Sequence, residues 1–516
     1  MKFSTTDIVI FAIYLTGLSA TGLWLSFRQK QKDTKDYFLA SKSLPWWAVG
    51  GSLIASNISA EQFIGMSGSG YVVGMAIASY ELMAAITLIL VAKFMLPIFL
   101  EKGIYTMPQF LEQRFDSRVR TGLAIFWVLL FVFVNITSVL YLGGLALNNI
   151  MGFKLIYSVI GLALFAATFS IFGGLKTVVW TDVIQVIVLI IGGIVASVLV
   201  LSAIGGNFID GFALLLERAP EKFDMILDKS HAEYKNLPGI SVLIGGMWIA
   251  NIYYWGNNQY IIQRSLGAKN LKEAQKGTAF AAILKLILPL IVVVPGIAAY
   301  VLQADITKPD EAYPWVLTNY VTVGFKGLAF AALIAAIGSS LSSMVNSAST
   351  IFTLDIYKHA AKNASEKHLV KIGRIVAALC LFVGIIVAPL LGNLDQAFQY
   401  IQEYTGFISP GVVVIFLFGM FWKKTSANAA FWIVILSIPL SVALKYFTPL
   451  IPFMNRMGLA FLILSAIIVI ISLIENRWID KNAIRLDTSM FKTDKTFNIT
   501  AFFIIGILAV IYAIWW

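Results

Sequence analysis

Charged residues are scarce in this chain of 516 residues. Asp, Glu, Lys and Arg make up 13% of the sequence and hydrophobic residues 59%, which leaves too little polar surface to cover a water-soluble globule. The single cysteine, Cys380, excludes a disulfide within the chain and a thiolate-based metal site. The glycine-rich phosphate-binding motif of ATP-driven proteins is also missing. These absences indicate an all-α polytopic membrane protein without direct ATP drive.

Apolar runs of about 20 residues recur along the chain, and each is long enough to cross a hydrocarbon layer about 30 Å thick. The first is followed by Arg28 and several lysines, which favours a retained span over a cleaved signal peptide. Together the runs predict about 14 transmembrane helices at 7–27, 44–70, 73–99, 121–148, 154–173, 177–204, 239–262, 274–302, 324–357, 370–390, 395–421, 425–447, 457–475 and 498–516.

Most of the 38 Lys and Arg residues fall in loops on the same side as residues 28–42. The positive-inside rule places that side in the cytoplasm and both termini outside, which in a bacterium means the inner membrane. The formal net charge of +11 therefore reflects orientation in a lipid bilayer, and no nucleic-acid partner is expected. The sequence leaves the oligomeric state open.

Polar residues interrupt two predicted spans, at 56–62 (SNISAEQ) and at 250–259 (ANIYYWGNNQ). Because lipid cannot hydrogen-bond to backbone, such breaks belong where protein lines a cavity. The broken spans lie five apart and run in opposite directions, which predicts two inverted five-helix units related by an in-plane pseudo-two-fold axis. Asn57 and Asn251 are expected at equivalent points. The predicted divisions are an extra helix and cytoplasmic loop (1–43), a first unit (44–204), an extracytoplasmic loop (205–238), a second unit (239–421) and three C-terminal helices (422–516).

Several polar and aromatic residues of the predicted spans could contact a solute between the breaks. Amides, carboxylates and one lysine can donate to and accept from many hydroxyls, and aromatic faces can stack on a pyranose ring, which suits a neutral polyol. Apart from Arg374, near the start of the span 370–390, no arginine falls within a predicted span, which disfavours an anionic solute. A purely structural ion pair of Lys285 with Glu81 or Glu61 is the alternative. The candidates are Asn57, Glu61, Gln62, Glu81, Asn135, Asn251, Tyr254, Trp255, Lys285 and Gln402.

A serine-rich span supplies candidate cation ligands. Ala336, Ser339, Ser340 and Ser343 share one helix face, and two hydroxyls with a carbonyl there could join the carbonyls of the first break. Alternatively, these small residues only allow close helix packing. Asp182 could complete a separate cation site with Ser342 and Ser343, or could be an interfacial carboxylate that faces water.

Six motifs follow one another along the chain, at 37–47 (YFLA followed by SLPWW), 57–65 (NISAEQFIG), 180–185 (WTDVIQ), 251–255 (NIYYW), 399–406 (QYIQEYTG) and, in the tail, 488–491 (TSMF). Together they resemble the sodium:solute symporter family, and in particular its sodium/glucose cotransporter branch. The likeness covers essentially the whole chain, because the motifs occur in one order from residue 37 to residue 491.

The resemblance implies a LeuT-like 5+5 inverted repeat with flanking helices and sodium-driven sugar uptake by alternating access, with no enzymatic step. It implies a sodium site made by the carbonyls of Ala55, Ile58 and Ala336 and the hydroxyls of Ser339 and Ser340. It implies gating by Tyr254 beneath the sugar and by Met66 and Phe398 above it. The implied sugar contacts are Asn57, Gln62, Glu81, Asn251, Lys285 and Gln402, with Asn135 close by.

Two positions depart from the bacterial galactose-transporting members of that branch. Ala84 stands where they have a serine, so one hydroxyl contact is lost and the sugar preference is open. Ser342 stands where they have alanine. Asp182, Ser339, Ser342 and Ser343 then resemble the additional site of two-sodium relatives, which gives the hypothesis of two Na⁺ per sugar.

The sequence thus favours a sodium-coupled symporter for a neutral hexose, galactose or glucose. Another polyol or a sugar acid such as sialic acid is the nearest alternative. A sugar sensor or a sodium channel with the same pocket belongs to a different class. A membrane enzyme would need a nucleophile with a base or a metal constellation, and the candidate residues offer neither.

Overall fold

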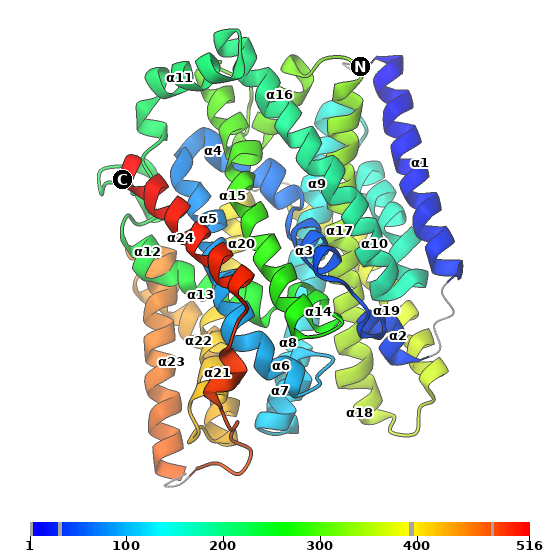
Figure 1. Ribbon diagram of the computed structural model, residues 1–516, viewed down its shortest axis with the longest axis vertical. Coiled ribbons are helices and arrows are strands. Elements are labelled where there is room, and N and C mark those ends of the chain that lie inside the picture. Colours follow the sequence, from blue (N-terminus) through cyan, green and yellow to red (C-terminus); the bar gives the residue numbers. More distant parts are fainter. Residues whose placement is uncertain (1–3, 29–32, 392–396, 476–478) are drawn as a thin grey trace.

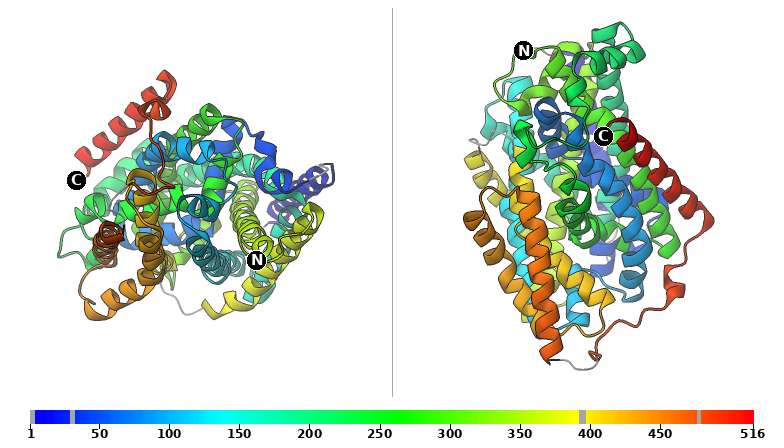
Figure 2. Two further views of the ribbon diagram at one scale, coloured as in Figure 1. Left: turned by 90° about the horizontal axis from the view of Figure 1, so that it is seen from below. Right: turned by 90° about the vertical axis from the view of Figure 1, so that its left-hand side faces the viewer.

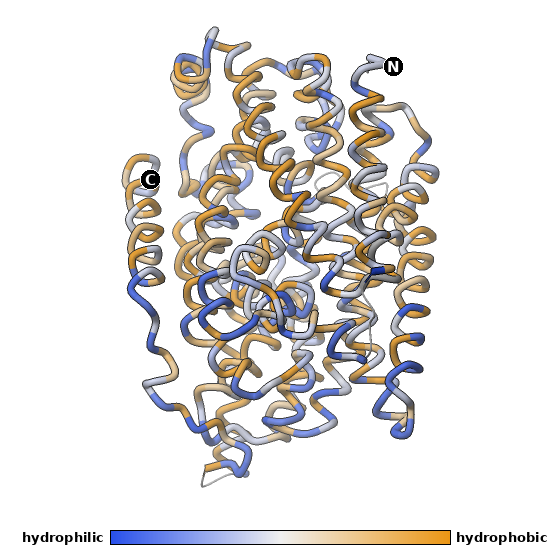
Figure 3. The backbone as a smooth tube through the Cα atoms, turned by 45° about the vertical axis from the view of Figure 1, so that its right-hand side comes forward, coloured by the Kyte–Doolittle hydropathy of each residue, from blue (hydrophilic) through white to orange (hydrophobic). Residues whose placement is uncertain are grey.

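The predicted all-helical membrane architecture is confirmed. The computed structural model describes residues 4–28, 33–391, 397–475 and 479–516, and this part of the chain consists of helices and connecting loops with no named strand (Figure 1). Ten helices in it are long and apolar enough to cross a membrane. Figure 3 shows hydrophobic residues along most of the length of the outer helices. The count of 14 spans stays a prediction, because the remaining segments are short or interrupted.

The first half of the chain supplies the first broken helix and the long helices that pack around it. Its α-helices are α1 (Thr5–Arg28), α2 (Thr34–Leu39), α3 (Trp46–Asn57), α4 (Ser67–Val73), α5 (Ser79–Leu90), α6 (Leu96–Glu101), α7 (Met107–Arg114), α8 (Ser117–Leu130), α9 (Thr137–Met151), α10 (Leu155–Gly205) and α11 (Phe208–Arg218). Several are joined into longer rods by the wider turns η2 (Glu61–Met66), η4 (Val91–Met95) and η5 (Phe131–Ile136).

The second half supplies the other broken helix, its supporting helices and a C-terminal group. Its α-helices are α12 (Ser241–Ile244), α13 (Gly246–Ile252), α14 (Gln259–Leu266), α15 (Leu271–Val301), α16 (Ala312–Tyr320), α17 (Phe325–Ile351), α18 (Lys358–Ala360), α19 (Glu366–Val387), α20 (Ala397–Thr405), α21 (Ser409–Phe421), α22 (Ala427–Phe447), α23 (Phe453–Glu475) and α24 (Lys495–Ile514). The wider turn η8 (Tyr253–Asn257) follows α13, and η10 (Phe352–Tyr357) follows α17.

Both predicted breaks are present. In the first, α3 ends at Asn57 and Ile58 is extended (φ −74°, ψ 103°). In the second, η8 ends at Asn257 and Asn258 is extended (φ −81°, ψ 124°) before α14 begins. The residue equivalent to Asn57 is therefore Asn257, and the expected equivalence of Asn57 with Asn251 is wrong. Asn251 lies one wide helical turn earlier, because the helix continues through η8.

The helix α10 is 51 residues long and consists of two spans joined at a sharp turn. Gly174 makes this turn with φ 59° and ψ −171°. A Cβ atom there would lie 2.5 Å from the carbonyl oxygen of Tyr37, so both the backbone conformation and the close approach require glycine. The sequence placed the division between 173 and 177, which agrees with this turn.

Helix α15 packs against both halves of the first broken helix, α3 and α4. A Cβ atom at Gly277 would lie 2.6 Å from the carbonyl oxygen of Trp46 at the start of α3, and one at Gly296 would lie 2.0 Å from that of Ser67 at the start of α4. The two glycines thus let the backbones approach closely, as small residues do at helix contacts in membranes. This approach fixes Lys285 of α15 at the level of the break.

Helices α1 and α24 lie at the periphery, and α22 and α23 form a separate pair on one side (Figures 1 and 2). The predicted outer loop 205–238 contains α11 and two short helical turns, as expected for a region too small to be a domain. Helix α16 lies in the connection between α15 and α17. The broken helices therefore lie inside a ring of continuous helices.

Candidate functional site

A cavity of about 60 Å³, lined by polar, aromatic and apolar side chains, lies between the two broken helices. Its lining includes every predicted solute contact except Asn135, and also the predicted gate residues Met66 and Phe398. A cavity that encloses a ligand commonly measures about 300–1,000 Å³, so this one is closed around its own side chains. The predicted contacts that line it are Asn57, Gln62, Glu81, Asn251, Tyr254, Lys285 and Gln402.

Lys285 is the central donor of this cavity. Its side chain is fully buried, and its Nζ forms an ion pair with Glu81 and donates a hydrogen bond to Asn57 Oδ1. The Nζ atom also lies 4.8 Å from the ring centroid of Trp255, which adds a cation–π contact. Of the two alternatives that the sequence left open for an ion pair, the structure shows Glu81. The cavity therefore presents a lysine and a carboxylate that neutralise each other.

Tyr254 lines the cavity and contacts Tyr260, which lies outside the lining; the side of the cavity formed by Tyr254 is here called its floor. Asn57 Nδ2 donates to Tyr254 Oη at 3.0 Å, and Tyr260 Oη donates to the same oxygen at 2.7 Å. The Tyr254 ring meets those of Trp255 and Tyr260 edge to face. Tyr254 is thus held by both broken helices, since Asn57 is the last residue of α3 and Tyr260 lies in the first turn of α14.

The amide side chains that were predicted to contact the solute differ in the hydrogen bonds that they make within the protein. Gln62 Oε1 accepts from the backbone N and the hydroxyl of Ser59, and Asn251 Nδ2 donates to the Met247 carbonyl. Gln402 lines the cavity from α20. Asn135 is buried in η5, away from the lining, and its Oδ1 has no hydrogen-bond partner in the part of the chain that the structure describes.

The predicted gate residues Met66 and Phe398 line the same cavity as Tyr254. Both are buried, and the Phe398 ring lies edge to face against Tyr80 with centroids 5.2 Å apart. Ala84 is buried in the lining, so this position offers the cavity a methyl group and no hydroxyl. Glu61 accepts from Ser138 at 2.8 Å and lies at the edge of the same cavity.

The predicted sodium ligands lie where α17 crosses the C-terminal end of α3. Ser340 Oγ is 3.1 Å from the Ser56 carbonyl oxygen and 3.4 Å from that of Ile58. The last carbonyls of a helix carry partial negative charge, which attracts a cation. Ala55 and Ala336 are buried in the same two helices. In the described residues no cluster of three His, Cys, Asp or Glu side chains exists, so carbonyl and hydroxyl oxygens are the available ligands.

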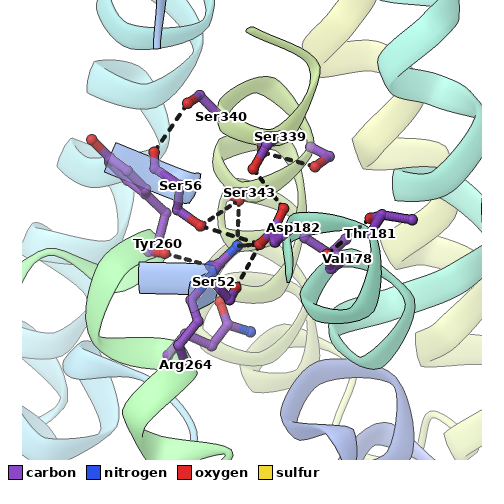
Figure 4. A network of polar contacts seen from close by, with 12 residues as sticks. Ser52, Ser56, Val178, Thr181, Asp182, Tyr260, Arg264, Ser339, Ser340 and Ser343 are labelled. Atoms are coloured by element: carbon purple, nitrogen blue, oxygen red, sulfur yellow. Dashed lines mark hydrogen bonds and ion pairs between the residues drawn. The ribbon is translucent and has the colours of Figure 1, made fainter. Parts of the chain in front are cut away.

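Asp182 is the centre of a second polar cluster, shown in Figure 4. It is fully buried and accepts hydrogen bonds at 2.5 Å from both Ser52 and Ser339. Ser343 joins the cluster through Ser56, with their hydroxyl oxygens 3.0 Å apart. Asp182 is therefore not an interfacial carboxylate. Ser339, which the resemblance assigned to both cation sites, donates to Asp182 here, while Ser342 donates to the Ser339 carbonyl at 2.8 Å.

Arg264 is the residue that the sequence prediction missed. The predicted span ended at 262, but α14 continues to Leu266 and carries Arg264 into the protein with a fully buried side chain. Its Nη2 lies 3.8 Å from Asp182 Oδ2, and the guanidinium donates to the Ser52 and Ser343 hydroxyls and to the Tyr260 carbonyl. Arg264 therefore places a guanidinium in the interior of the protein, although its position lies outside the predicted spans.

Comparison with known proteins places this architecture in a family. The model of the sodium:solute symporter family matches residues 37–437. The chain belongs to the sodium:solute symporter family. This symporter is 54% identical to the sodium/glucose cotransporter of Vibrio parahaemolyticus, over 99% of this chain and 98% of that protein. It is 33% identical to human sodium/myo-inositol cotransporter 2, over 83% of this chain and 67% of that protein.

A solved structure shares the fold of this symporter. The Na⁺-coupled sialic acid symporter, in a substrate-bound outward-open state, matches with a TM-score of 0.80 at 24% identity, over 92% of this chain and 98% of that one. The likeness confirms the LeuT-like fold and carries no information on the solute. Family membership makes this chain a multi-pass membrane transporter with Na⁺ as the co-transported ion.

Proposed function

We propose that this symporter imports a neutral hexose, galactose or glucose, unchanged and together with sodium, by alternating access. The observation that carries the proposal is the neutral ion pair of Lys285 and Glu81 inside the cavity. Such a pair presents donors and acceptors to hydroxyl groups without offering net charge to an anion. The 54% identity with a protein named as a sodium/glucose cotransporter supports the same reading.

The proposed sugar contacts are those that the cavity gathers, with Tyr254 beneath the ring and Met66 and Phe398 above it. Sugar hydroxyls would replace the bonds that Lys285, Glu81 and Asn57 now make with one another, so binding exchanges one set of hydrogen bonds for another. An apolar sugar face would stack on Tyr254. Asn135 takes a supporting position behind the lining.

Sodium is proposed to bind between α3 and α17, at the carbonyls of Ala55, Ile58 and Ala336 and the hydroxyls of Ser339 and Ser340. Of these, Ser340 is already within 3.4 Å of the Ile58 carbonyl oxygen. One charge that crosses a potential of 100 mV supplies about 2.3 kcal/mol before any sodium concentration gradient is added. At about 1.4 kcal/mol per tenfold, that energy is sufficient to concentrate a sugar about 40-fold.

The proposal also includes the orientation of the chain in the membrane and the movement of its two units. We infer insertion in a bacterial inner membrane with both termini outside, because basic residues gather in the loops of the opposite face. The two inverted units, 44–204 and 239–421, would rock around the site at their broken helices. Helices α22, α23 and α24 flank the second unit.

The likeness to myo-inositol cotransporters makes another polyol the second candidate. Uptake into proteoliposomes separates the candidates: labelled galactose is supplied under an inward sodium gradient, with potassium replacing sodium as the control. Unlabelled glucose, myo-inositol and sialic acid serve as competitors. Concentrative, sodium-dependent uptake that glucose inhibits is expected. No sodium-dependent uptake of galactose, together with uptake of labelled myo-inositol or sialic acid, would refute the hexose. Sugar-evoked current without accumulation would indicate a sensor or channel.

A further inference from the structure

The Asp182 cluster already holds a cation that belongs to the protein. The Arg264 guanidinium and the Asp182 carboxylate are both fully buried, with Nη2 and Oδ2 3.8 Å apart. Ser52 bridges them, since its hydroxyl donates to Asp182 at 2.5 Å and accepts from Arg264 Nε at 3.3 Å. A buried carboxylate needs a positive partner, and Arg264 supplies it.

The Arg264 guanidinium also donates a hydrogen bond to a hydroxyl oxygen that would have to bind a second sodium ion. Arg264 Nη2 donates to Ser343 Oγ, and Ser343 is one of the ligands that the two-sodium hypothesis requires. Ser342, the serine that prompted the hypothesis, donates to its own helix at the Ser339 carbonyl. A Na⁺ ion beside Asp182 would lie within a few ångströms of the guanidinium, where like charges repel strongly because little water is present.

We propose that Arg264 and a second sodium ion exclude each other at Asp182, so that Arg264 sets the coupling at one Na⁺ per sugar. The proposal rests on sodium-coupled sugar transport as proposed above. In place of the two ions expected from Ser342, the symporter carries one mobile ion, at the Ser340 site, and one tethered cation. Arg264 is thus a residue that determines stoichiometry, although it does not touch the sugar.

The position of Arg264 links this tethered cation to the sugar cavity. Arg264 lies one turn after Tyr260 on α14 and donates to the Tyr260 carbonyl, while Tyr260 Oη donates to Tyr254 at the cavity floor. Because α14 is a short rigid helix, a displacement that opens the floor also carries Arg264 relative to Asp182. The chain of contacts from Lys285 through Asn57, Tyr254 and Tyr260 to Arg264 connects the two sites.

The test is the coupling ratio, measured as the reversal potential of sugar-dependent sodium flux in proteoliposomes. The wild type should couple one Na⁺ per sugar, Arg264→Gln two, and the double variant Arg264→Gln/Asp182→Asn one again. Arg114→Gln is the matched control, because Arg114 is also buried and paired with an acid, Asp480, outside the cluster. The control should keep the wild-type ratio. A wild-type ratio of two, or a ratio of one for Arg264→Gln, would overturn the proposal.

If Arg264→Gln does not transport sugar, a measurement of sodium binding tests the proposal instead. Purified variants are melted in NaCl and in KCl without sugar, and the sodium-dependent rise in melting temperature is compared. Arg264→Gln should gain a larger rise than the wild type, and Asp182→Asn in the same background should remove the gain. An equal rise in wild type and Arg264→Gln refutes the exclusion. This measurement needs no sugar, so it stays informative if the hexose assignment itself fails.

Discussion

Replacing Lys285 with methionine tests how the cavity balances its charges. Methionine keeps much of the aliphatic length of lysine but removes the ammonium, which leaves Glu81 with a side chain only 4% exposed and without its positive partner. Breaking a buried ion pair on one side costs about 3–5 kcal/mol. The double variant Lys285→Met/Glu81→Gln removes both charges and should recover a large part of that loss.

Sugar transport should respond differently from stability. The ammonium donates to both Glu81 and Asn57 at the point where the sugar is proposed to bind, so its removal leaves acceptors unpaired in the sugar complex. Loss of such donors costs about 1–3 kcal/mol. This corresponds to a rise of about 5- to 150-fold in the KM for sugar at about 1.4 kcal/mol per tenfold.

Two measurements check these expectations: melting temperature in detergent and initial rates of galactose uptake over a range of sugar concentrations. Lys285→Met should be less stable than the double variant, yet both should have a raised KM, because neither restores the donor. Lys93→Met, a lysine outside the cavity lining, is the matched control and should change neither value. The reasoning is refuted if Lys285→Met keeps the wild-type KM, or if the double variant is no more stable than the single one.

Three further changes probe the floor, the sodium site and the periphery. Tyr254→Phe keeps the ring and should raise the KM for sugar by less than Tyr254→Ala, because stacking is worth about 0.5–1.5 kcal/mol beyond buried area; equal losses in uptake assays would contradict stacking. Ser340→Ala should raise the sodium concentration for half-maximal uptake several-fold, whereas Ser349→Ala, whose hydroxyl donates to its own helix at Asn346, should not; the same shift in both would remove Ser340 from the site. Asp7 accepts hydrogen bonds from the backbone N atoms of Gly324 and Gly327 at the start of α17. Asp7→Ala should therefore lower the free energy of unfolding by about 0.5–2 kcal/mol, and Asp7→Asn should lower it by less. An unchanged melting temperature of Asp7→Ala would show that the contact is not stabilising.

Much of the site could be predicted because polar residues in apolar spans are conspicuous. The motif around Asn57 and the pair Asn251 and Tyr254 stand out against hydrophobic neighbours, and the structure gathers them with Lys285 and Glu81 in one cavity. Asn135, a predicted contact, is buried in η5 and is not among the residues that line the cavity. A wide helical turn shifts every later side chain around the helix, so sequence spacing alone does not predict which side chains reach a cavity.

Other features depended on contacts between distant segments. Asn257, not Asn251, is the counterpart of Asn57, because the helix runs on through η8 before it breaks. Arg264 stood outside its predicted span and had the pattern of a loop residue, whereas α14 carries it into contact with Asp182, 82 positions earlier in the sequence. One feature of the sequence points to the pairing of Asp182 with Arg264. A buried acid such as Asp182 requires a positive partner, and Arg264 follows the broken span closely.

The amino-acid order alone was sufficient to determine that lipid surrounds this protein, and to determine its helical class, its two broken spans and most of the polar residues of its cavity, because lipid tolerates polar backbone and charge only around a cavity. The partners of the charged groups came from packing: Lys285 with Glu81, and Arg264 with Asp182. The strength of a charge pair depends on distance and burial, which are set by how α14, α15 and α17 approach α3 and α10 and not by any local pattern.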